Sequence, residues 1–206
     1  MKTISIVDYG LGNIHSIKNA INYLGCKSRM VSSAVEILEA THLILPGVGA
    51  FPYAMKLLRE NGLNQSILEF SKNGRPILGI CLGLQLLFEK STENGLCEGL
   101  SLLKGRVDRY KQNKNFRIPQ IQWNQLIKRD SCPIMTGIKN KEYFYFANSY
   151  CVDVTSLDKN YNIYISKYAN QQYLSLIEYK NIIGVQFHPE KSGKSGLKLI
   201  GNFIKK

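Results

Sequence analysis

The apolar residues in the first half of the chain follow two alternating spacings. Apolar runs at residues 43–45 and 76–80, and a mainly apolar run at residues 4–7 that includes Ser5, are typical of strands that are buried on both faces of a sheet. Between them, apolar residues recur at helical spacing, as in Ile14, Ile17, Ile21 and Leu24 and again in Phe51, Ala54, Met55 and Leu58. Repeated strand–helix units of this kind predict an α/β fold with a mainly parallel sheet flanked by helices.

Several further elements extend this pattern. Residues 28–31 are a candidate strand, and a helical segment around residues 67–70 is expected to end near Gly74. Asn13 is a suitable N-cap for the first helix and Gly25 a suitable end. A helix from Leu84 to Lys90 is expected after the third apolar run.

The second half of the chain has a different texture. Residues 143–146 and 161–165 are aromatic and β-branched, with polar turns between them, which predicts additional, partly antiparallel strands between residues 105 and 179. A final helix is indicated by Leu197, Ile200 and Ile204. Because the sequence has no internal repeat and no linker, residues 1–206 are expected to form a single domain.

Charge adds little to this picture. Lys and Arg number 27 against 15 Asp and Glu, a net charge of +12, but the basic residues are scattered. Their densest stretch, from Arg106 to Arg117 with Arg109, Lys111 and Lys114, is interpreted as a solvated loop, although a nucleic-acid patch is the alternative. No nucleic-acid motif accompanies it, so no nucleic-acid partner is expected.

The five cysteines form no CxxC pair and their number is odd. This predicts a reduced, cytoplasmic protein without disulfides, a zinc site or another metal, and no cofactor is indicated. No stretch approaches the roughly 18 apolar residues of a membrane span, and the N-terminus lacks a signal-peptide pattern. No membrane association is therefore expected.

The strongest local motif is Gly-Ile-Cys-Leu-Gly at residues 79–83, between an apolar strand and a helix. This is the setting of a nucleophile elbow, where flanking side chains would collide with the strand or the helix and glycines are required. The helix N-terminus behind Cys81 favours the thiolate form. A structural cysteine between two packing glycines is the alternative interpretation.

A second motif is Gln-Phe-His-Pro-Glu at residues 186–190. A thiolate nucleophile needs a proton acceptor that later protonates the leaving amine, and His188 titrates in the right range. Glu190 can orient the imidazole if the segment is extended, because alternate side chains then share a side. A surface histidine at a strand end is the alternative.

A third motif is Pro-Gly-Val-Gly-Ala-Phe at residues 46–51, directly after an apolar strand. Glycines there let backbone N–H groups approach a ligand, so this segment is a candidate oxyanion hole together with the N–H of Leu82. A simple turn is the alternative. If the three motifs meet, Cys81 attacks an amide, His188 protonates the departing ammonia and water releases the acyl group.

Taken in this order, the three motifs resemble those of the class I, triad-type glutamine amidotransferases. Within that class the chain looks most like the glutaminase subunits of imidazole glycerol phosphate synthase, through residues 6–13, 45–51, 123–124 and 188–193. The resemblance covers essentially the whole chain. It implies a hydrolase that acts on the carboxamide of glutamine, within a complex that acts as a lyase in histidine biosynthesis.

The resemblance also implies roles for individual residues. It assigns the catalytic triad to Cys81, His188 and Glu190, and the oxyanion hole to Val48, Gly49 and Leu82. Glutamine would be bound by Gly47, Gly49, Gln85, Ser149 and Tyr150. The implied partner is a (β/α)8-barrel cyclase in a heterodimer, facing Asn13, Trp123 and Lys191.

One alternative within the family remains open. The chain has Gln120, Gln122 and Asn148 where the family usually has His, Gly and His. These differences favour a paralogous glutaminase that supplies ammonia to a sugar amidotransferase in surface-polysaccharide biosynthesis. A catalytically silent binding subunit is a further alternative, against which the intact triad argues.

Overall fold

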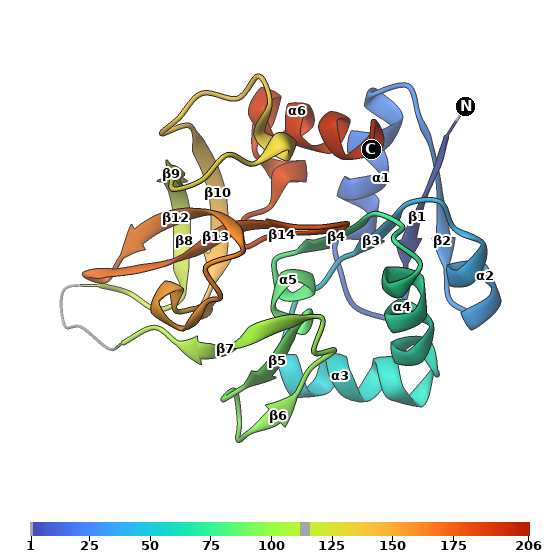
Figure 1. Cartoon of the computed structure of the whole chain (residues 1–206), viewed down its shortest axis with the longest axis horizontal. Helices are drawn as coiled ribbons and strands as arrows, with labels where there is room; N and C mark the ends of the chain where they lie inside the picture. Colours follow the sequence, from blue (N-terminus) through green and yellow to red (C-terminus); the bar gives the residue numbers. More distant parts are fainter. Residues whose placement is uncertain (1, 112–115) are drawn as a thin grey trace.

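Five parallel strands form one side of the main sheet, and three antiparallel strands extend it on the other. The structure is a computed structural model that describes residues 2–111 and 116–206. The strand order is β2-β1-β3-β4-β14-β13-β12-β9 (Figure 1). The strands are β1 (Thr3–Val7), β2 (Lys27–Val31), β3 (Leu43–Leu45), β4 (Ile77–Ile80), β9 (Ile127–Lys128), β12 (Asn162–Tyr168), β13 (Gln171–Tyr179) and β14 (Ile182–Val185).

Helices cover both faces of this sheet. α1 (Ile14–Tyr23) and α6 (Gly193–Ile204) lie on one face, and α2 (Ala34–Glu39), α3 (Phe51–Glu60), α4 (Leu63–Lys72) and α5 (Leu82–Leu86) lie on the other (Figure 1). In β3, Leu43 and Leu45 join the core beneath α3 and α4, whereas Ile44 joins the core beneath α1 and α6. Burial on both faces explains the uninterrupted apolar runs. The predicted α/β fold is confirmed.

Two smaller sheets are attached to the main one. β5 (Phe88–Ser91), β6 (Cys97–Glu98), β7 (Leu103–Arg109) and β11 (Tyr150–Val152) form a four-stranded sheet. β8 (Gln120–Gln125) and β10 (Tyr143–Asn148) pair antiparallel. The described residues also form three 3-10 turns: η1 (Pro133–Met135), η2 (Val154–Ser156) and η3 (Pro189–Lys191).

The helix expected from Leu84 to Lys90 is wrong in its second half. The helix ends at Leu86, and Phe88 begins β5, which pairs in parallel with β7. Leu84, Leu87 and Phe88 have helical spacing, but the partner strand lies more than a dozen residues further along the chain. Long-range strand pairing therefore overrides the local pattern.

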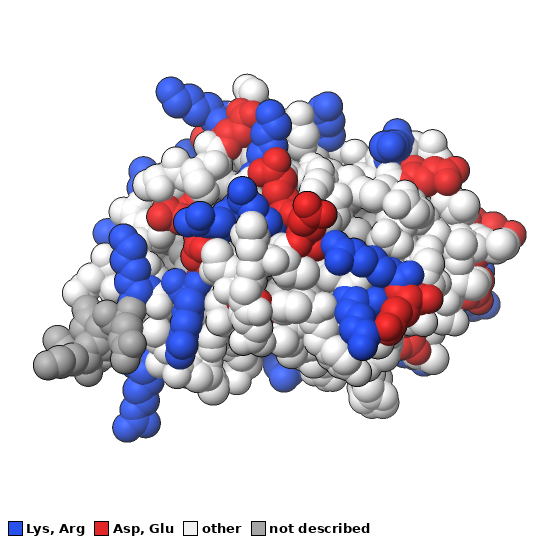
Figure 2. Space-filling model, turned by 90° about the horizontal axis from the view of Figure 1, so that it is seen from below, with Lys and Arg blue, Asp and Glu red and all other residues white. Residues whose placement is uncertain are grey.

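The basic stretch is not simply a loop. Arg106 and Arg109 belong to β7, and Lys114 lies outside the described residues. On the face seen in Figure 2, Lys and Arg side chains stand apart from one another or beside Asp and Glu. In residues 2–111 and 116–206, no helix combines the length and apolar character that crossing a bilayer requires.

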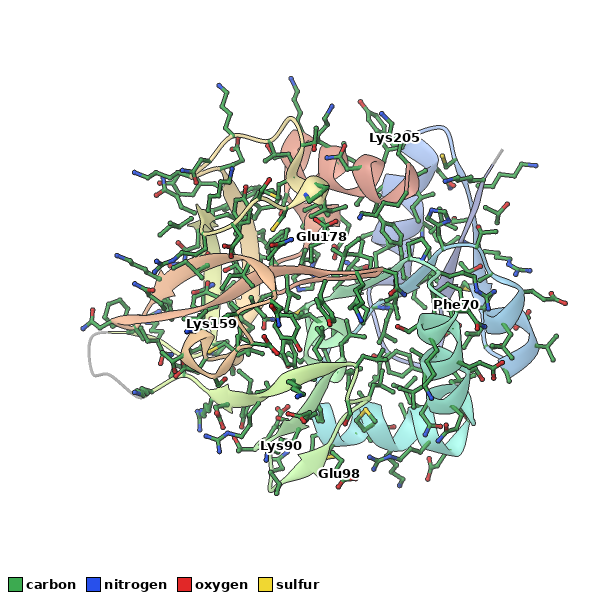
Figure 3. All side chains as sticks on the ribbon, viewed as in Figure 1. Phe70, Lys90, Glu98, Lys159, Glu178 and Lys205 are labelled. Carbon is green, nitrogen blue, oxygen red and sulfur yellow. The ribbon has the colours of Figure 1, made fainter. Side chains whose placement is uncertain are left out.

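The C-terminal helix is tied to the sheet by a buried carboxylate. Glu178 on β13 accepts a hydrogen bond from the Ile134 N–H at 2.9 Å and pairs with Lys206 Nζ at 2.5 Å. Figure 3 shows Glu178 on the side of β13 that faces η1 and α6. This anchor fixes α6, which follows directly on the segment that carries His188 and Glu190.

Candidate active site

Cys81 lies in the sharp turn between β4 and α5. Its backbone has φ 54° and ψ −108°, a conformation that residues with a side chain rarely adopt. The Cys81 N–H donates a 2.7 Å hydrogen bond to the carbonyl of Val185 on the neighbouring strand β14. Strained turns held in this way are characteristic of nucleophile elbows.

Two glycines make the turn possible. A Cβ atom on Gly83 would lie 1.9 Å from the carbonyl oxygen of Leu45 on β3. A Cβ atom on Gly79 would lie 2.7 Å from the carbonyl oxygen of Gly83. The expected collisions are therefore present, with the adjacent strand in one case and with the following helix in the other.

His188 and Glu190 form a buried pair. The imidazole Nδ1 is 2.9 Å from Glu190 Oε1, and the two side chains are 5% and 1% exposed. The expectation that an extended segment brings them together is wrong, because residues 189–191 form the 3-10 turn η3. The turn is held by Lys191 N–H and Ser192 Oγ, which both donate to the His188 carbonyl, at 3.0 and 2.6 Å.

This environment favours the charged imidazole. Burial disfavours the imidazolium, but Cys81 and Glu190 outweigh it through hydrogen bonds and opposite charge, and the pKa of His188 rises to about 10. Because Nδ1 donates its hydrogen to Glu190, the other ring nitrogen is the one that can form a hydrogen bond with Cys81. The arrangement can hold one proton between a sulfur and an imidazole.

One cavity of about 320 Å³ collects most of the predicted site residues. Cys81 and His188 line it, and Glu190 is buried behind His188. The other predicted residues in its wall are Val48, Gly49, Leu82, Gln85, Ser149, Tyr150 and Lys191. Gly47, Asn13 and Trp123 are not part of the wall.

The segment between β3 and α3 forms one side of the cavity. Tyr9 Oη donates a 2.8 Å hydrogen bond to the Pro46 carbonyl. A Cβ atom on Gly47 would lie 2.7 Å from that hydroxyl and 2.9 Å from Leu82 Cβ, so only glycine fits beneath the elbow. Gly49 has φ 103°, a second position that favours glycine.

Three residues near the cavity have no role that the sequence motifs predicted. They are Tyr9, Glu93, whose carboxylate accepts a 2.8 Å hydrogen bond from the Phe51 N–H, and Gln186, which is fully buried beside Cys81. The position of Gln186, two residues before His188, was a usable signal. The sequence held no comparable signal for Glu93, because its place depends on the unpredicted strands β5 and β6.

The unusual amides Gln120 and Asn148 belong to a buried network beside the site. Gln120 Nε2 donates to Tyr173 Oη at 2.9 Å, and Asn148 Nδ2 donates to Tyr110 Oη at 2.9 Å. Asn148 also lines the cavity. The two tyrosine rings meet edge to face with their centroids 5.3 Å apart. Burial raises the pKa of both hydroxyls, so this network stays neutral.

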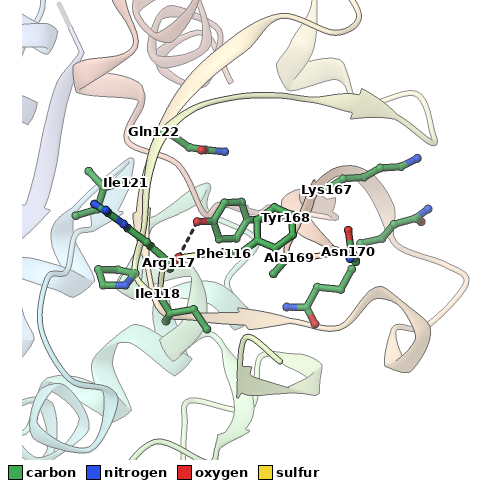
Figure 4. Close-up of a pocket in the computed structure, with 12 residues that line it drawn as sticks. Phe116, Arg117, Ile118, Ile121, Gln122, Lys167, Tyr168, Ala169 and Asn170 are labelled. Atoms are coloured by element: carbon green, nitrogen blue, oxygen red, sulfur yellow. Dashed lines mark hydrogen bonds between the residues drawn. The ribbon is translucent and has the colours of Figure 1, made fainter. Parts of the chain in front are cut away.

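A larger cavity of about 1090 Å³ lies elsewhere, between residues 116–122 and 167–172 (Figure 4). Its wall includes Tyr168, whose hydroxyl donates to the Arg117 carbonyl at 2.6 Å. It contains neither Cys81 nor His188 and shares only Pro119 with the smaller cavity. Size alone does not identify the reactive site, and the smaller cavity holds the reactive groups.

Comparison with known proteins gives a consistent result. The family profile described as "Glutamine amidotransferase class-I" matches residues 5–206. The imidazole glycerol phosphate synthase subunit HisH of Caldanaerobacter subterraneus subsp. tengcongensis is 43% identical, over 97% of this chain and 96% of that protein. The subunit of the same name from Prochlorococcus marinus is 40% identical, over 99% and 96%.

Solved structures agree on the fold. A crystal structure of a glutamine amidotransferase superimposes with a TM-score of 0.76 at 19% identity, covering 98% of this chain and 97% of that one. The structure of PurLQS from Thermotoga maritima gives 0.74 at 20% identity, covering 99% and 98%. Together with the sequence matches, these results show that the chain belongs to the class I glutamine amidotransferase family, among relatives of the subunit HisH.

Proposed function

We propose that this chain hydrolyses glutamine to glutamate and ammonia as the glutaminase subunit of an imidazole glycerol phosphate synthase, in histidine biosynthesis. The observation that carries the proposal is the meeting of Cys81 and His188 in one cavity, with Glu190 2.9 Å behind the imidazole. The names of the relatives described above supply the pathway. None of the relatives described above is named for the sugar-modifying alternative.

In this proposal Cys81 is the nucleophile and His188 the acid and base. The thiolate attacks the carboxamide carbon, the C–N bond breaks, and His188 gives its proton to the departing amide nitrogen, which leaves as ammonia. Water then attacks the thioester and gives a proton to His188 as glutamate leaves. Glu190 fixes the imidazole ring and stabilises its charged form.

The negative oxygen that develops during attack needs fixed donors. We assign these to the backbone N–H groups of Val48, Gly49 and Leu82, all of which belong to residues that line the cavity beside Cys81. Leu82 is the first residue of α5, and the first N–H groups of a helix have no partner within it. Gly47, which precedes Val48 and Gly49, packs against Tyr9 and the elbow, where there is no room for a side chain.

Glutamine itself would be held by the far wall of the cavity. We assign its binding to Gln85, Ser149, Tyr150 and Gly49, which line the cavity, and to the adjoining Gly47, which lies outside the wall. A volume of about 320 Å³ is at the small end for ligand pockets, which suits a single amino acid.

The partner is proposed to dock on the exposed face of β8 and β10. Trp123 is 51% exposed, and it pairs across the two strands with Tyr145, their rings 6.2 Å apart. Ile121, 62% exposed, pairs in the same way with Ala147. These four side chains form an apolar strip, and Ala147 at its end is also part of the cavity wall. An apolar strip that starts at the site of ammonia release is well placed for a protein that consumes ammonia.

One predicted interface residue lies beside these strands, and another lies at the same edge of the main sheet as the elbow. Lys191 lines the cavity, and its Nζ lies 5.9 Å from the centre of the Tyr145 ring. Asn13 caps α1 at the carboxyl end of β1, the same edge of the sheet that carries the elbow. We infer that the partner is a (β/α)8-barrel cyclase bound as a heterodimer, and that residues 1–206 act as one domain in the cytoplasm, where the five free thiols stay reduced.

Complementation tests the proposal. A histidine auxotroph that lacks this subunit receives the chain together with the barrel protein encoded beside it. Growth without histidine is expected with the native chain and is expected to be lost with Cys81→Ala. If the native chain does not restore growth while the purified pair still releases ammonia from glutamine, the ammonia is delivered to another acceptor and the histidine-pathway assignment is wrong.

A further inference from the structure

Gln186 lies behind the cavity wall, in contact with Cys81 and Gln85, two of the residues that line it. Its Nε2 atom is 3.7 Å from Cys81 Sγ, and the whole residue is 0% exposed. Gln186 follows directly on β14, two residues before His188. The backbone N–H of Gln186 donates to the Ser175 carbonyl on β13 at 2.9 Å, so the residue is fixed between the central strands.

The orientation of this amide follows from its partners. Gln85 Nε2 is 3.0 Å from the carbonyl oxygen of Tyr150, which can only accept a hydrogen bond, so this end of Gln85 is the donor. The same nitrogen is 3.0 Å from Gln186 Oε1. Gln186 must therefore accept there, and its own NH2 group faces Cys81. The backbone carbonyl of Tyr150 thus fixes the direction of two hydrogen bonds, the one from Gln85 to Gln186 and the one from Gln186 to Cys81.

A donor in that position acts differently on the two forms of cysteine. A thiolate accepts a hydrogen bond far more strongly than a neutral thiol, and hydrogen bonds to charged groups are the stronger kind. Burial away from water increases the difference further. The Gln186 amide therefore stabilises the charged sulfur and restrains the direction in which it points.

We propose that Gln186 is a further catalytic residue, whose amide N–H holds Cys81 as a correctly aimed thiolate, and that Gln85 positions this amide. The inference rests on the proposed function, in which Gln85 belongs to the glutamine pocket. Both hydrogens of the Gln85 NH2 group are used, by Tyr150 and by Gln186. Gln85 therefore offers its substrate only an oxygen, and the residue that contacts glutamine also orients the donor on the nucleophile.

Alkylation of Cys81 by iodoacetamide, a small neutral electrophile, tests the inference. The rate is measured across a pH series for the native chain and for Gln186→Met, and mass spectrometry of the peptide that contains Cys81 separates it from the other thiols. Loss of one hydrogen bond to a charged group should move the midpoint of the profile to alkaline pH by about one unit. The other titratable groups near Cys81 are unchanged in this variant: His188, Glu190, Tyr9, Glu93 and Lys191.

Gln120→Met is the matched control. Gln120 is equally buried at 0% exposed and also makes side-chain amide hydrogen bonds, but these go to Tyr173 and not to the sulfur. Its midpoint should stay at the native value. An unmoved midpoint in a folded Gln186→Met protein, or an equal shift in both variants, would overturn the inference.

Gln186→Glu serves if the methionine variant does not fold. This variant keeps the shape of the side chain and the acceptor for Gln85 but replaces the donor by a carboxylate. The midpoint of its alkylation profile should therefore also be more alkaline than the native value, and an unmoved midpoint would overturn the inference. Alkylation needs no glutamine and no partner. The inference can therefore fail while glutamine hydrolysis is confirmed, or hold while glutamine hydrolysis is refuted.

Discussion

The hydroxyl of Tyr9, just after β1, is bonded to the carbonyl of Pro46, just after β3, at 2.8 Å. Both residues are buried, and the bond fixes the peptide that leads into Gly47. The bond joins two parallel strands at the edge of the sheet where the cavity lies. It therefore fixes the position at which the Gly47–Gly49 segment begins, and we assign the oxyanion donors to this segment.

Tyr9→Phe is expected to affect both stability and hydrolysis. The buried Pro46 carbonyl loses its donor, so the free energy of unfolding should fall by about 1–3 kcal/mol in urea titrations. The turnover of glutamine should fall because the Gly47–Gly49 segment is less well fixed. Ammonia-dependent turnover by the complex is the control and should be unchanged. An unchanged glutaminase rate would show that this hydrogen bond does not position the oxyanion donors.

The protonation of His188 should depend on Cys81. The folded-state pKa, raised to about 10 by Cys81 and Glu190 against the cost of burial, exceeds the ordinary value of 6.5. The resulting contribution to stability is therefore fully present below pH 6.5 and is lost as the pH rises through 10. In Cys81→Ala, nitrogen NMR of the imidazole should show titration at a lower pH than in the native chain. Equal titration in both proteins would contradict the pairing.

Glu190→Gln tests the carboxylate separately. The amide oxygen can still accept from Nδ1 of His188, so the ring keeps a partner, but the negative charge behind it is lost. The turnover of glutamine should fall at least about tenfold, because an opposite charge at this range shifts the equilibrium by one pKa unit or more. Steady-state kinetics with the partner present measure the effect. A loss confined to KM would instead indicate a role in substrate binding.

The elbow glycine should tolerate no side chain. In Gly83→Ala the new Cβ would lie 1.9 Å from the Leu45 carbonyl, so β3 and α5 must separate and the free energy of unfolding should fall by about 3 kcal/mol or more. Gly201→Ala is the matched control within α6, because its nearest contact is 3.9 Å away. That variant should be more stable by about 0.5–1 kcal/mol. Thermal and urea unfolding of both variants decide the comparison.

Local patterns in the sequence predicted the parallel half of the fold well. Runs such as Leu43-Ile44-Leu45 are apolar at every position because both faces of β3 are covered, and this can be read without knowing the neighbours. The strand at Phe88 could not be predicted in this way, because its partner β7 is set by long-range pairing. The short helix α2 was also missed, although Ser33 and Glu36 form a capping box at its N-terminus.

The candidate site shows the same division. The elbow at Cys81 was predictable because its glycines are required by contacts within a few residues and with the next strand. The contact between His188 and Glu190 was predicted from their spacing, but through the wrong backbone conformation, since a 3-10 turn also brings residues two apart together here. The donor on Gln186 depends on Gln85, which is 101 residues away in the chain, and required the fold.

The strand that leads to His188, β14, is the last strand of the described residues, yet it lies in the interior of the main sheet, between β4 and β13. While the chain is being synthesised, β4 therefore has an unpaired edge until residues 182–185 have left the ribosome. The sulfur of Cys81 meets its imidazole only after that insertion. A nascent or truncated chain that lacks residues 182–190 thus carries an inert cysteine and an aggregation-prone edge, so the fold itself delays reactivity until this strand has been inserted.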